Sequence, residues 1–431
     1  MDRDRYVDFL RAWAIVLVVV GHWVITGLVR HPDGSIGAPE LLATVPWTQW
    51  LTLGFQIMPL FFLAGGYAAG RSWERARADG GTVAEWVGRR AIRLLLPTAV
   101  YSAPALLGLW VAALAGVDAG TLGLVGWALA MQFWFLPVYL LLSALTPALY
   151  AAHRRWGMWV PLAMGAVAVV VSSGGVDRLG PVNYVLVWGV VYQLGFCWRD
   201  GLTGGRRRVS GALALGGGLG FAALVGFGPF PVSLILVTGQ DPSNTDPPSA
   251  ALLAWAVGQV GLTLLVAPLV RRVLQRERVW RAVRGVGAAS MTLYLWHMLP
   301  VLVIAAVLYL PGLAPQPEFA SGVWWAWRVP WVLALGGVLI GVVRALGPLE
   351  RGLAVWGRRV RPGAGVWAGL ALSVPSLAYF AGHGFAPHGE VPLPAAVGLA
   401  AGTALVMWPG RRRASGATER AATEEPLKET A

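Results

Sequence analysis

Lysine and cysteine are almost absent from the sequence, and charged residues of either sign are few. Cys197 is the only cysteine among 431 residues, so the chain can form no intrachain disulfide and no cysteine-rich metal site. Because Cys197 falls at the end of an apolar segment, a catalytic thiol is not expected either. Lys428 is the only lysine, and every other basic residue is arginine. The cysteine count therefore excludes disulfide-rich scaffolds and cysteine-based metal centres.

The shortage of charge separates this chain from soluble proteins. Charged residues make up 13% of the sequence, against about 25% in soluble domains, whereas 56% of the residues are hydrophobic and the mean hydropathy is +0.61. We therefore predict an all-α polytopic membrane protein. The net charge of +13 does not indicate nucleic-acid binding, because the arginines lie in short clusters between apolar runs, where they set the orientation of a membrane protein.

Twelve apolar segments, separated by short polar connections, predict about twelve transmembrane helices. The first segment is too long for a cleaved signal peptide and contains His22, so we expect it to remain as a span. The segments lie at about residues 8–29, 50–70, 95–116, 124–149, 157–173, 181–198, 209–229, 249–270, 287–310, 323–345, 364–381 and 392–408.

Arginine alternates between the connections in a way that predicts the topology. Five connections are rich in arginine, and the intervening ones hold only Arg30 and Arg178. Because arginine-rich loops stay in the cytoplasm, we predict a multi-pass protein of the inner (plasma) membrane with both termini cytoplasmic. The connections around 71–94 and 271–286 are expected to form basic amphipathic helices along the inner surface. The arginine-rich connections are 71–94, 150–156, 199–208, 271–286 and 346–363.

The chain is predicted to consist of a membrane core, two further helices and a tail. Residues 1–348 form the ten-helix core, residues 349–408 the two additional helices, and residues 409–431 a polar, disordered cytoplasmic tail. The outer loop 240–248 contains two aspartates and no basic residue, which suits a solvated acidic loop and a substrate-contacting loop about equally. The glycines at 216–220 lie inside an apolar segment, so we expect them to pack helices rather than bind phosphate.

The first apolar segment carries three ionisable side chains on one helical face. Arg11 and His22 are 11 residues apart, which at about 100° per residue places them on nearly the same face and about 16 Å apart along the axis. Asp8 lies near that face, one turn before Arg11. Ionisable residues inside a membrane are costly and mark functional sites, so Asp8, Arg11 and His22 are candidate catalytic residues. Alternatively, Asp8 and Arg11 anchor the helix at the interface and His22 bonds to a neighbouring helix.

A second polar stripe lies in the ninth segment. Ser290, Tyr294 and His297 are spaced i, i+4 and i+7, so they share one face of a helix within the membrane and are candidates for substrate contact. Three further motifs stand out in the sequence. They are Pro59–Tyr67 in the second segment, Arg89-Arg90-x-x-Arg93 on the cytoplasmic side and Phe133–Pro137 in the fourth segment.

Together these motifs resemble the acyltransferase-3 family of integral membrane acyltransferases. The resemblance covers residues 5–345, and the motifs occur in the order that the family shows. The family usually has a serine before the glycine of the second-segment motif, where this chain has Gly65, and the last two segments extend beyond the common core. The matching motifs are Arg11-x10-His22, the Phe-Phe-x-x-x-Gly-aromatic pattern at 61–67, Arg89-Arg90-x-x-Arg93 and the Tyr-Leu-x-His segment at 294–297.

The resemblance implies transfer of an acyl group, commonly acetyl, from acyl-CoA to a hydroxyl of a glycan, a lipid-linked sugar or a small secondary metabolite. His22 is then the candidate general base, since a neutral imidazole can accept the proton of a hydroxyl. Arg11 and the motif Arg89, Arg90 and Arg93 suit the phosphates of CoA. The distance of about 16 Å between Arg11 and His22 resembles the reach of an extended pantetheine arm. No metal and no nucleic acid are expected, whereas membrane lipids and a second copy of the chain are candidate partners.

Other interpretations fit parts of the sequence. A twelve-span transporter fits the span count, but such transporters usually show internal repeats, and the polar first segment has no counterpart in the seventh. In a membrane acyltransferase of another type, His297 would be the primary histidine and His22 the secondary one. For the arginines at 89–93, anchoring by the positive-inside rule is about as good an explanation as CoA binding.

Overall fold

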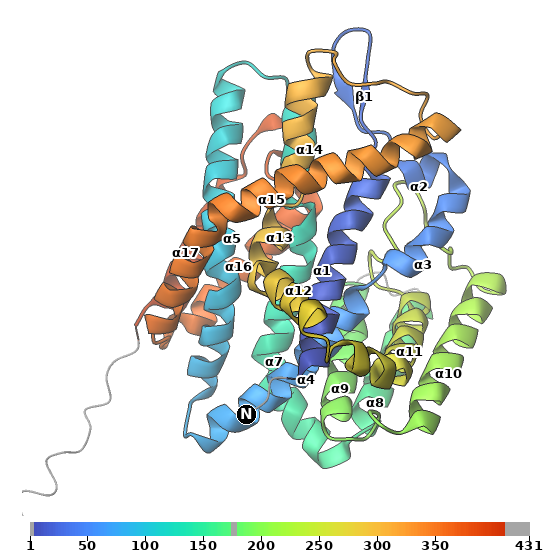
Figure 1. Ribbon diagram of the computed structural model, residues 1–431. Helices are drawn as coiled ribbons and strands as arrows, with labels where there is room; N and C mark the ends of the chain where they lie inside the picture. Colours follow the sequence, from blue (N-terminus) through green and yellow to red (C-terminus); the bar gives the residue numbers. More distant parts are fainter. Residues whose placement is uncertain (1–3, 174–178, 410–431) are drawn as a thin grey trace, which may run out of the picture.

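The computed structural model describes residues 4–173 and 179–409, and these residues fold almost entirely into helices (Figure 1). The strands of this part of the chain are β1 (Val29–Arg30) and β2 (Ile36–Gly37), which pair antiparallel. The prediction of an all-α protein is therefore confirmed. The predicted tail lies outside the described residues, apart from residue 409.

The helices follow the order of the predicted apolar segments, and each segment coincides with one helix or with consecutive helices. In chain order the helices are α1 (Arg5–Ile25), α2 (Leu41–Thr44), η1 (Pro46–Leu51), α3 (Thr52–Phe55), α4 (Met58–Ala78), α5 (Val83–Leu114), α6 (Ala119–Ala130), η2 (Met131–Trp134), α7 (Phe135–Trp156), α8 (Trp159–Ser173), α9 (Val182–Arg199), α10 (Arg207–Gly226), α11 (Ala250–Val273), α12 (Glu277–Ala288), α13 (Ser290–Trp296), α14 (Leu299–Ile304), η4 (Ala305–Tyr309), α15 (Gly322–Arg359), α16 (Gly365–His383), η5 (Pro387–Gly389) and α17 (Leu393–Met407).

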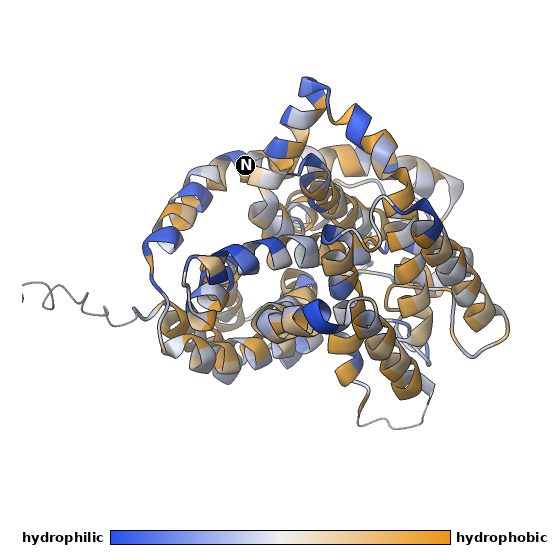
Figure 2. Cartoon of the chain, turned by 90° about the horizontal axis from the view of Figure 1, so that it is seen from below, coloured by the Kyte–Doolittle hydropathy of each residue, from blue (hydrophilic) through white to orange (hydrophobic). Residues whose placement is uncertain are grey.

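The lengths of the helices show a multi-pass membrane protein. In the described residues 8 helical stretches are long and apolar enough to cross a membrane, or 9 if the bent pair of α13 and α14–η4 is one span. The remaining apolar segments are α8, α9 and α17, with 15, 18 and 15 residues, which is short for a core that needs about 20. Hydrophobic residues cover most of the helices around the periphery, as the view from below shows (Figure 2). The count of twelve spans and the cytoplasmic termini stay predictions.

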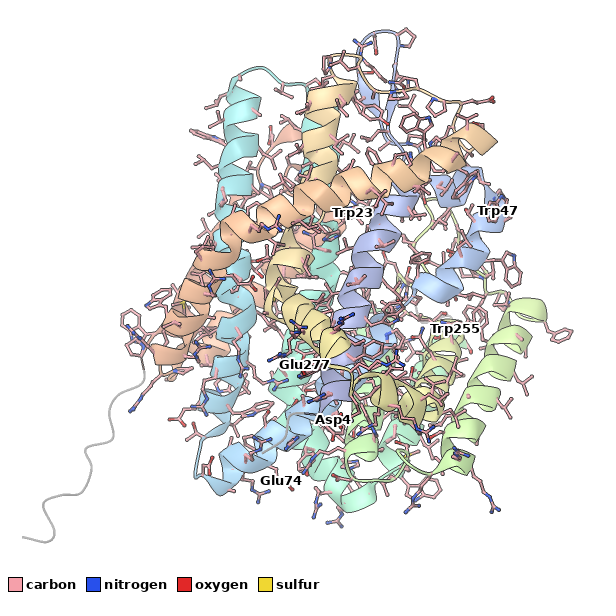
Figure 3. All side chains as sticks on the ribbon, viewed as in Figure 1. Asp4, Trp23, Trp47, Glu74, Trp255 and Glu277 are labelled. Carbon is pink, nitrogen blue, oxygen red and sulfur yellow. The ribbon has the colours of Figure 1, made fainter. Side chains whose placement is uncertain are left out.

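α1 runs through the molecule and contacts helices from all along the chain (Figure 1). Its N-terminus is capped by Asp4, whose carboxylate accepts a hydrogen bond from the backbone amide of Tyr6. α4, α11, α12, α13 and α15 pack against it. Asp4 lies at the lower end of α1 in Figure 3 and Trp23 near the upper end. The α4–α5 and α9–α10 connections also lie at the lower end, which we call the arginine-rich end.

One segment contains a 3-10 turn and another is broken by a bend, both at places where the predicted motifs lie. The fourth changes from α6 to the 3-10 turn η2, which contains Phe133, and then continues as α7. The ninth is bent by 45° between α13 and α14. Pro300, near the start of α14, has no backbone N–H with which to continue the hydrogen bonding of α13, which explains the break. His297 lies within this break.

The prediction of a separate surface helix in the connection 71–94 is wrong. α4 continues to Ala78 and α5 begins at Val83, so two long helices meet in a tight hairpin. Thr82 and Glu85 form a capping box that starts α5 at this point. The arginines at 89–93 therefore belong to a long apolar helix and not to a separate surface segment. The connection 271–286 does contain a helix, α12, which packs against α1, and its place along the inner surface of the membrane stays a prediction.

The two C-terminal helices pack on helices of the predicted core. α16 and α17 contact α5, and α16 also contacts η2 and α7. After α16, the backbone amide of Phe385 donates to the carbonyl of Gly126 at 3.0 Å, and the Phe385 ring packs edge-on against Phe133 of η2. The division predicted at residue 348 falls inside α15, a single helix of 38 residues. The C-terminal helices thus cover the 3-10 turn of the fourth segment.

Close helix packing explains two glycine motifs. A Cβ atom at Gly66 of α4 would lie 2.0 Å from the carbonyl oxygen of Tyr192 on α9. One at Gly217 of α10 would lie 2.2 Å from the backbone nitrogen of Gly258 on α11. Both distances are shorter than a van der Waals contact, so these helix pairs need glycine to approach so closely. The packing role predicted for the glycines at 216–220 is confirmed at Gly217.

The segment between α10 and α11 folds back against the helices at the opposite end. Leu234 is fully buried, its amide donates to Oγ1 of Thr52 at 2.9 Å, and its carbonyl accepts from Gln56 at 2.6 Å. The two aspartates of the predicted acidic loop, Asp241 and Asp246, are exposed. Their exposure fits the interpretation as a solvated acidic loop. Contact of this loop with a substrate stays a prediction.

Candidate functional site

Two histidines from distant parts of the chain meet inside the molecule. His22 lies on α1 and His297 in the break after α13, and Nδ1 of His22 lies 3.1 Å from Nε2 of His297. The two rings are inclined by 25°, with centroids 5.0 Å apart. His297 is fully buried, whereas His22 is only partly buried, so His22 is the more accessible residue of the pair. The two polar stripes therefore meet in one histidine pair.

The hydrogen bonds of the histidine pair determine the tautomer of each neutral ring. Nδ1 of His297 lies 2.9 Å from the backbone carbonyl of Tyr294, which only accepts hydrogen bonds, so this nitrogen carries the hydrogen. Nε2 of His297 then holds a lone pair and accepts the Nδ1 hydrogen of His22. Nε2 of His22 is left with a lone pair, which is the form that a general base requires.

Gln132 and Tyr294 join the 3-10 turn of the fourth segment to the bent ninth segment. The Tyr294 hydroxyl donates to the backbone carbonyl of Gln132 at 2.6 Å. The side-chain amide of Gln132 donates to the carbonyls of Leu129 at 2.9 Å and Leu295 at 3.3 Å. Because buried carbonyls where a helix is irregular need partners from elsewhere, these bonds offset part of the cost of the turn and the bend. The hydroxyl of Tyr294 is thus engaged in supporting the site.

Three arginines gather around Tyr139 on the arginine-rich side of the histidine pair. They are Arg11 of α1 and Arg90 and Arg93 of α5, and the charges of all three act on the Tyr139 hydroxyl. Arg90 donates to this hydroxyl at 3.4 Å and to Ser72 at 3.2 Å. In the described part of the chain no carboxylate pairs with any of the three. Arg11 and Arg90 are partly buried and Arg93 is exposed, and the charges of Arg11 and Arg90 act on Arg93. Like charges without a counterion are costly, so this arginine cluster has the properties of an anion-binding site.

Gly65 leaves the space that Tyr139 occupies. A Cβ atom at Gly65 would lie 2.9 Å from the Tyr139 ring and 3.2 Å from its hydroxyl oxygen. A serine at this position would force the phenol ring to move. Where the family pattern has a serine, this chain therefore places the hydroxyl of Tyr139 beside the arginine cluster.

Aromatic rings connect the arginine cluster with the histidine pair. The Phe135 ring lies 5.1 Å from the Tyr139 ring and 5.9 Å from the Tyr294 ring. Phe61 packs edge-on against Phe135 at 4.9 Å. Phe61 belongs to the second-segment motif and Phe135 to the fourth-segment motif. These two motifs thus place apolar side chains between the charged cluster and the imidazoles.

Two predicted site residues, Asp8 and Ser290, lie apart from the histidine pair. Asp8 is half-buried and precedes His22 by 14 residues, or about 21 Å along α1, so it cannot contact the His22 ring. Arg89 is exposed on α5, as is Arg93, and its backbone carbonyl accepts a hydrogen bond from Arg93 at 3.3 Å. Ser290 begins α13, about 10 Å along the helix before His297. The other predicted residues belong to the groups described above.

Tyr139, Gln132 and Arg328 are site residues that the sequence analysis missed. Arg328 lies in the apolar helix α15, is only 8% exposed and donates to the carbonyl of Thr26 at 2.8 Å. An arginine inside an apolar segment is a signal that the sequence itself contains. Tyr139 and Gln132 gave no such signal, because tyrosine and glutamine commonly pack between helices without taking part in a site.

Comparison with known families decides between the functions that the sequence left open. A family model described as an acyltransferase domain matches residues 4–345, which is most of the chain. The chain belongs to the acyltransferase-3 family. The comparisons with curated proteins and with solved structures gave no match.

Membership of the acyltransferase-3 family makes this multi-pass membrane protein an acyltransferase. The matched region begins at the N-cap of α1 and ends within α15, so it contains both the histidine pair and the arginine cluster. α16 and α17 follow it. The family favours the enzyme over the transporter.

Proposed function

We propose that this acyltransferase moves an acyl group, commonly acetyl, from cytoplasmic acyl-CoA to a hydroxyl of a glycan, a lipid-linked sugar or a secondary metabolite, with His22 as the general base. The observation that carries the proposal is the contact between His22 and His297, which leaves a free lone pair on Nε2 of His22, the less buried residue of the two. The family supports the reaction class.

The arginine cluster is the proposed binding site for the phosphates of the donor. Guanidinium groups bind phosphate oxygens in pairs, and Arg11 and Arg90 each have a buried Nε atom that lacks a partner in the described structure. Arg11 and His22 are 11 residues apart on one continuous helix, or about 16 Å along its axis. Phosphates held at the cluster would therefore let an extended pantetheine arm reach His22 past the aromatic side chains.

In the proposed reaction, the acceptor hydroxyl attacks the carbonyl carbon of the thioester while Nε2 of His22 takes the hydroxyl proton. The new ester bond forms, the carbon–sulfur bond breaks, and protonated His22 gives the proton to the sulfur of CoA. The Nδ1 hydrogen of His22 stays bonded to His297 throughout, which keeps the ring oriented and stabilises the imidazolium. Acyl-CoA and an alcohol are the only reactants, and an ester and free CoA the only products.

Transfer by the purified protein in nanodiscs tests this function. With radiolabelled acetyl-CoA and an extract of envelope glycans, lipids and metabolites, we expect His22→Ala to lower the transfer rate by about 10²–10⁴, the usual contribution of a general base. His383→Ala is the matched control, because His383 is exposed at the end of α16 and should not affect the rate. Mass spectrometry then identifies the acceptor by the gain of one acyl group.

The same assay can assign the base to the other histidine. If His22→Ala transferred acetyl at the parent rate and His297→Ala did not, the general base would be His297. If the parent protein transferred nothing from acyl-CoA to any component of the extract, the proposed donor would be wrong.

A further inference from the structure

The break between α13 and α14 leaves the backbone carbonyl of His297 without a helical partner. In a continuous α-helix the amide of Val301 would donate to this carbonyl, but it donates to Met298 at 3.1 Å. The indole Nε1 of Trp23 donates to the His297 carbonyl instead, at 2.7 Å. Trp23 follows His22 on α1 and is only 3% exposed, so solvent cannot readily replace this bond. One indole thus joins the two backbone segments that carry the histidines.

α15 in turn holds the end of α1. The indole Nε1 of Trp331 donates to the backbone carbonyl of Trp23 at 2.9 Å, and Arg328 donates to the carbonyl of Thr26 at 2.8 Å. Both carbonyls lie at the C-terminal end of α1, where carbonyl groups lack partners within the helix. The positive charge of Arg328 also suits the negative end of the helix dipole.

The charge of Arg328 has no carboxylate to balance it in the described residues. Its guanidinium lies 3.9 Å from the centre of the Trp324 ring and 5.2 Å from that of Trp331. Cation–π contacts offset only part of the cost of burying a guanidinium. An apolar helix does not need a buried arginine to stay in a membrane. The contact of Arg328 with the end of α1 therefore indicates a specific role for this arginine.

We propose that Trp23, Trp331 and Arg328 are positioning residues that set the contact between His22 and His297. The inference rests on the proposed function, because it assigns these three residues to the same histidine pair. Without the Trp23 N–H, the His297 carbonyl would be unsatisfied and the helix break would relax. The 3.1 Å contact between the imidazoles would then lengthen, and His22 would lose the bond that determines its tautomer.

Tryptophan-to-phenylalanine variants test the proposal, because they remove the indole N–H and keep an aromatic ring. We expect Trp23→Phe and Trp331→Phe to lower kcat about tenfold, the effect of one lost hydrogen bond to a buried group, and to change the KM for acetyl-CoA less than about twofold. Arg328→Met should lower kcat similarly, and Arg328→Lys, which keeps a charged donor, should recover most of it. Trp327→Phe is the control, since Trp327 lies on the same helix and is 41% exposed.

Nitrogen NMR gives a second readout that does not need catalytic activity. The chain has 6 histidines, so labelling with ¹⁵N-histidine in nanodiscs gives few signals, and His22→Ala assigns the Nδ1 signal of His22 by its loss. We expect this signal to lose its hydrogen-bonded shift in Trp23→Phe and Trp331→Phe and to keep it in Trp327→Phe. The NMR result stands even if the parent transfers no acetyl group, so it separates a failure of the proposed function from a failure of this inference.

An unchanged histidine signal in both tryptophan variants would overturn the proposal, whether or not kcat fell. An equal loss of signal in Trp327→Phe would also overturn it. A lower unfolding temperature with the signal intact would show that the indoles only stabilise the fold. If Trp23→Phe does not fold, Trp331→Phe decides the question. The Trp331 N–H bonds to the backbone of Trp23 and not to His297 itself, so its loss disturbs the histidine pair less directly.

Discussion

Arg11, Arg90 and Arg93 repel one another, and each lacks a carboxylate partner in the described residues. Anchoring by the positive-inside rule would be satisfied by arginines that point in any direction at the membrane surface. Arg90 instead donates to the hydroxyl of Tyr139 within the molecule, and the charges of Arg11 and Arg93 also act on that hydroxyl. This arrangement favours a binding role over simple anchoring.

Replacing Arg90 and Arg93 together by glutamine should weaken CoA binding by about tenfold or more for each guanidinium removed, since hydrogen bonds to charged groups are the strong ones. The loss should shrink in 1 M salt, where the screening length is only about 3 Å. Calorimetric titration of the protein with CoA at low and high salt measures both effects. Arg206→Gln and Arg272→Gln, at exposed positions in other connections, are the controls. Equal losses from both pairs would show that the arginines only orient the protein.

For single residues, the sequence predicted which side chains are unusual but not which of them are in contact. His22 and His297 each stand out as an imidazole in an apolar segment. Their contact joins residues 275 positions apart and depends on a helix break, which the spacing within either segment cannot reveal. Asp8 shares a helical face with His22, yet the length of the helix keeps the two apart. The place of Tyr139 depends on the missing side chain at Gly65, which lies on another helix.

Among the helices, hydropathy predicted the positions of some to within a few residues, because lipid demands a continuous apolar surface. α11 covers Ala250–Val273 where 249–270 was expected, and α16 covers Gly365–His383 where 364–381 was expected. Hydropathy missed that α5 begins at Val83 and that α15 continues to Arg359, where the segments were expected to begin at 95 and end at 345. The 3-10 turn η2 and the bend after α13 were not predictable in this way. They are maintained by side chains from other spans, such as Gln132 and Trp23, and no local pattern contains that information.

The close packing of α10 on α11 can be tested by adding a single methyl group at Gly217. We expect Gly217→Ala to destabilise the protein by about 1–3 kcal/mol, because its Cβ would overlap the backbone of Gly258. Gly216→Ala is the matched control on the same helix, since no atom outside the local backbone lies within 4 Å of its Cβ. Alanine there should be neutral or slightly stabilising, because it favours helix. Thermal unfolding in detergent measures both variants, and equal midpoints would contradict this account of the packing.

Across the whole molecule, the arginine cluster and the histidine pair lie at different depths along α1. If the N-terminus is cytoplasmic, as the arginine distribution predicts, the cluster faces the cytoplasm. His22 then lies about 21 Å beyond Asp8, past the middle of a hydrocarbon core about 30 Å thick. This geometry favours a donor that arrives from the cytoplasm and an acceptor that arrives from the other side of the membrane.

Sealed inside-out vesicles test this direction of transfer. Acetyl-CoA added outside such vesicles should be consumed while the acylated product appears in the lumen, because acyl-CoA is too polar to cross the bilayer. Vesicles that contain His22→Ala are the control for leakage and for other enzymes. Product found only on the side of the acetyl-CoA would mean that the enzyme acts on a cytoplasmic acceptor.

α15 packs against the helices that carry the histidine pair and the arginine cluster. Near one end Arg328 bonds to α1 beyond His22, and near the other a Cβ on Gly357 would lie 3.1 Å from Ile92 of α5, the neighbour of Arg93. A straight helix of 38 residues is about 57 Å long, which is enough to reach from one group to the other. α15 therefore packs both against the end of α1 beside His22 and against the helix that carries Arg90 and Arg93, so the two groups share one neighbouring helix.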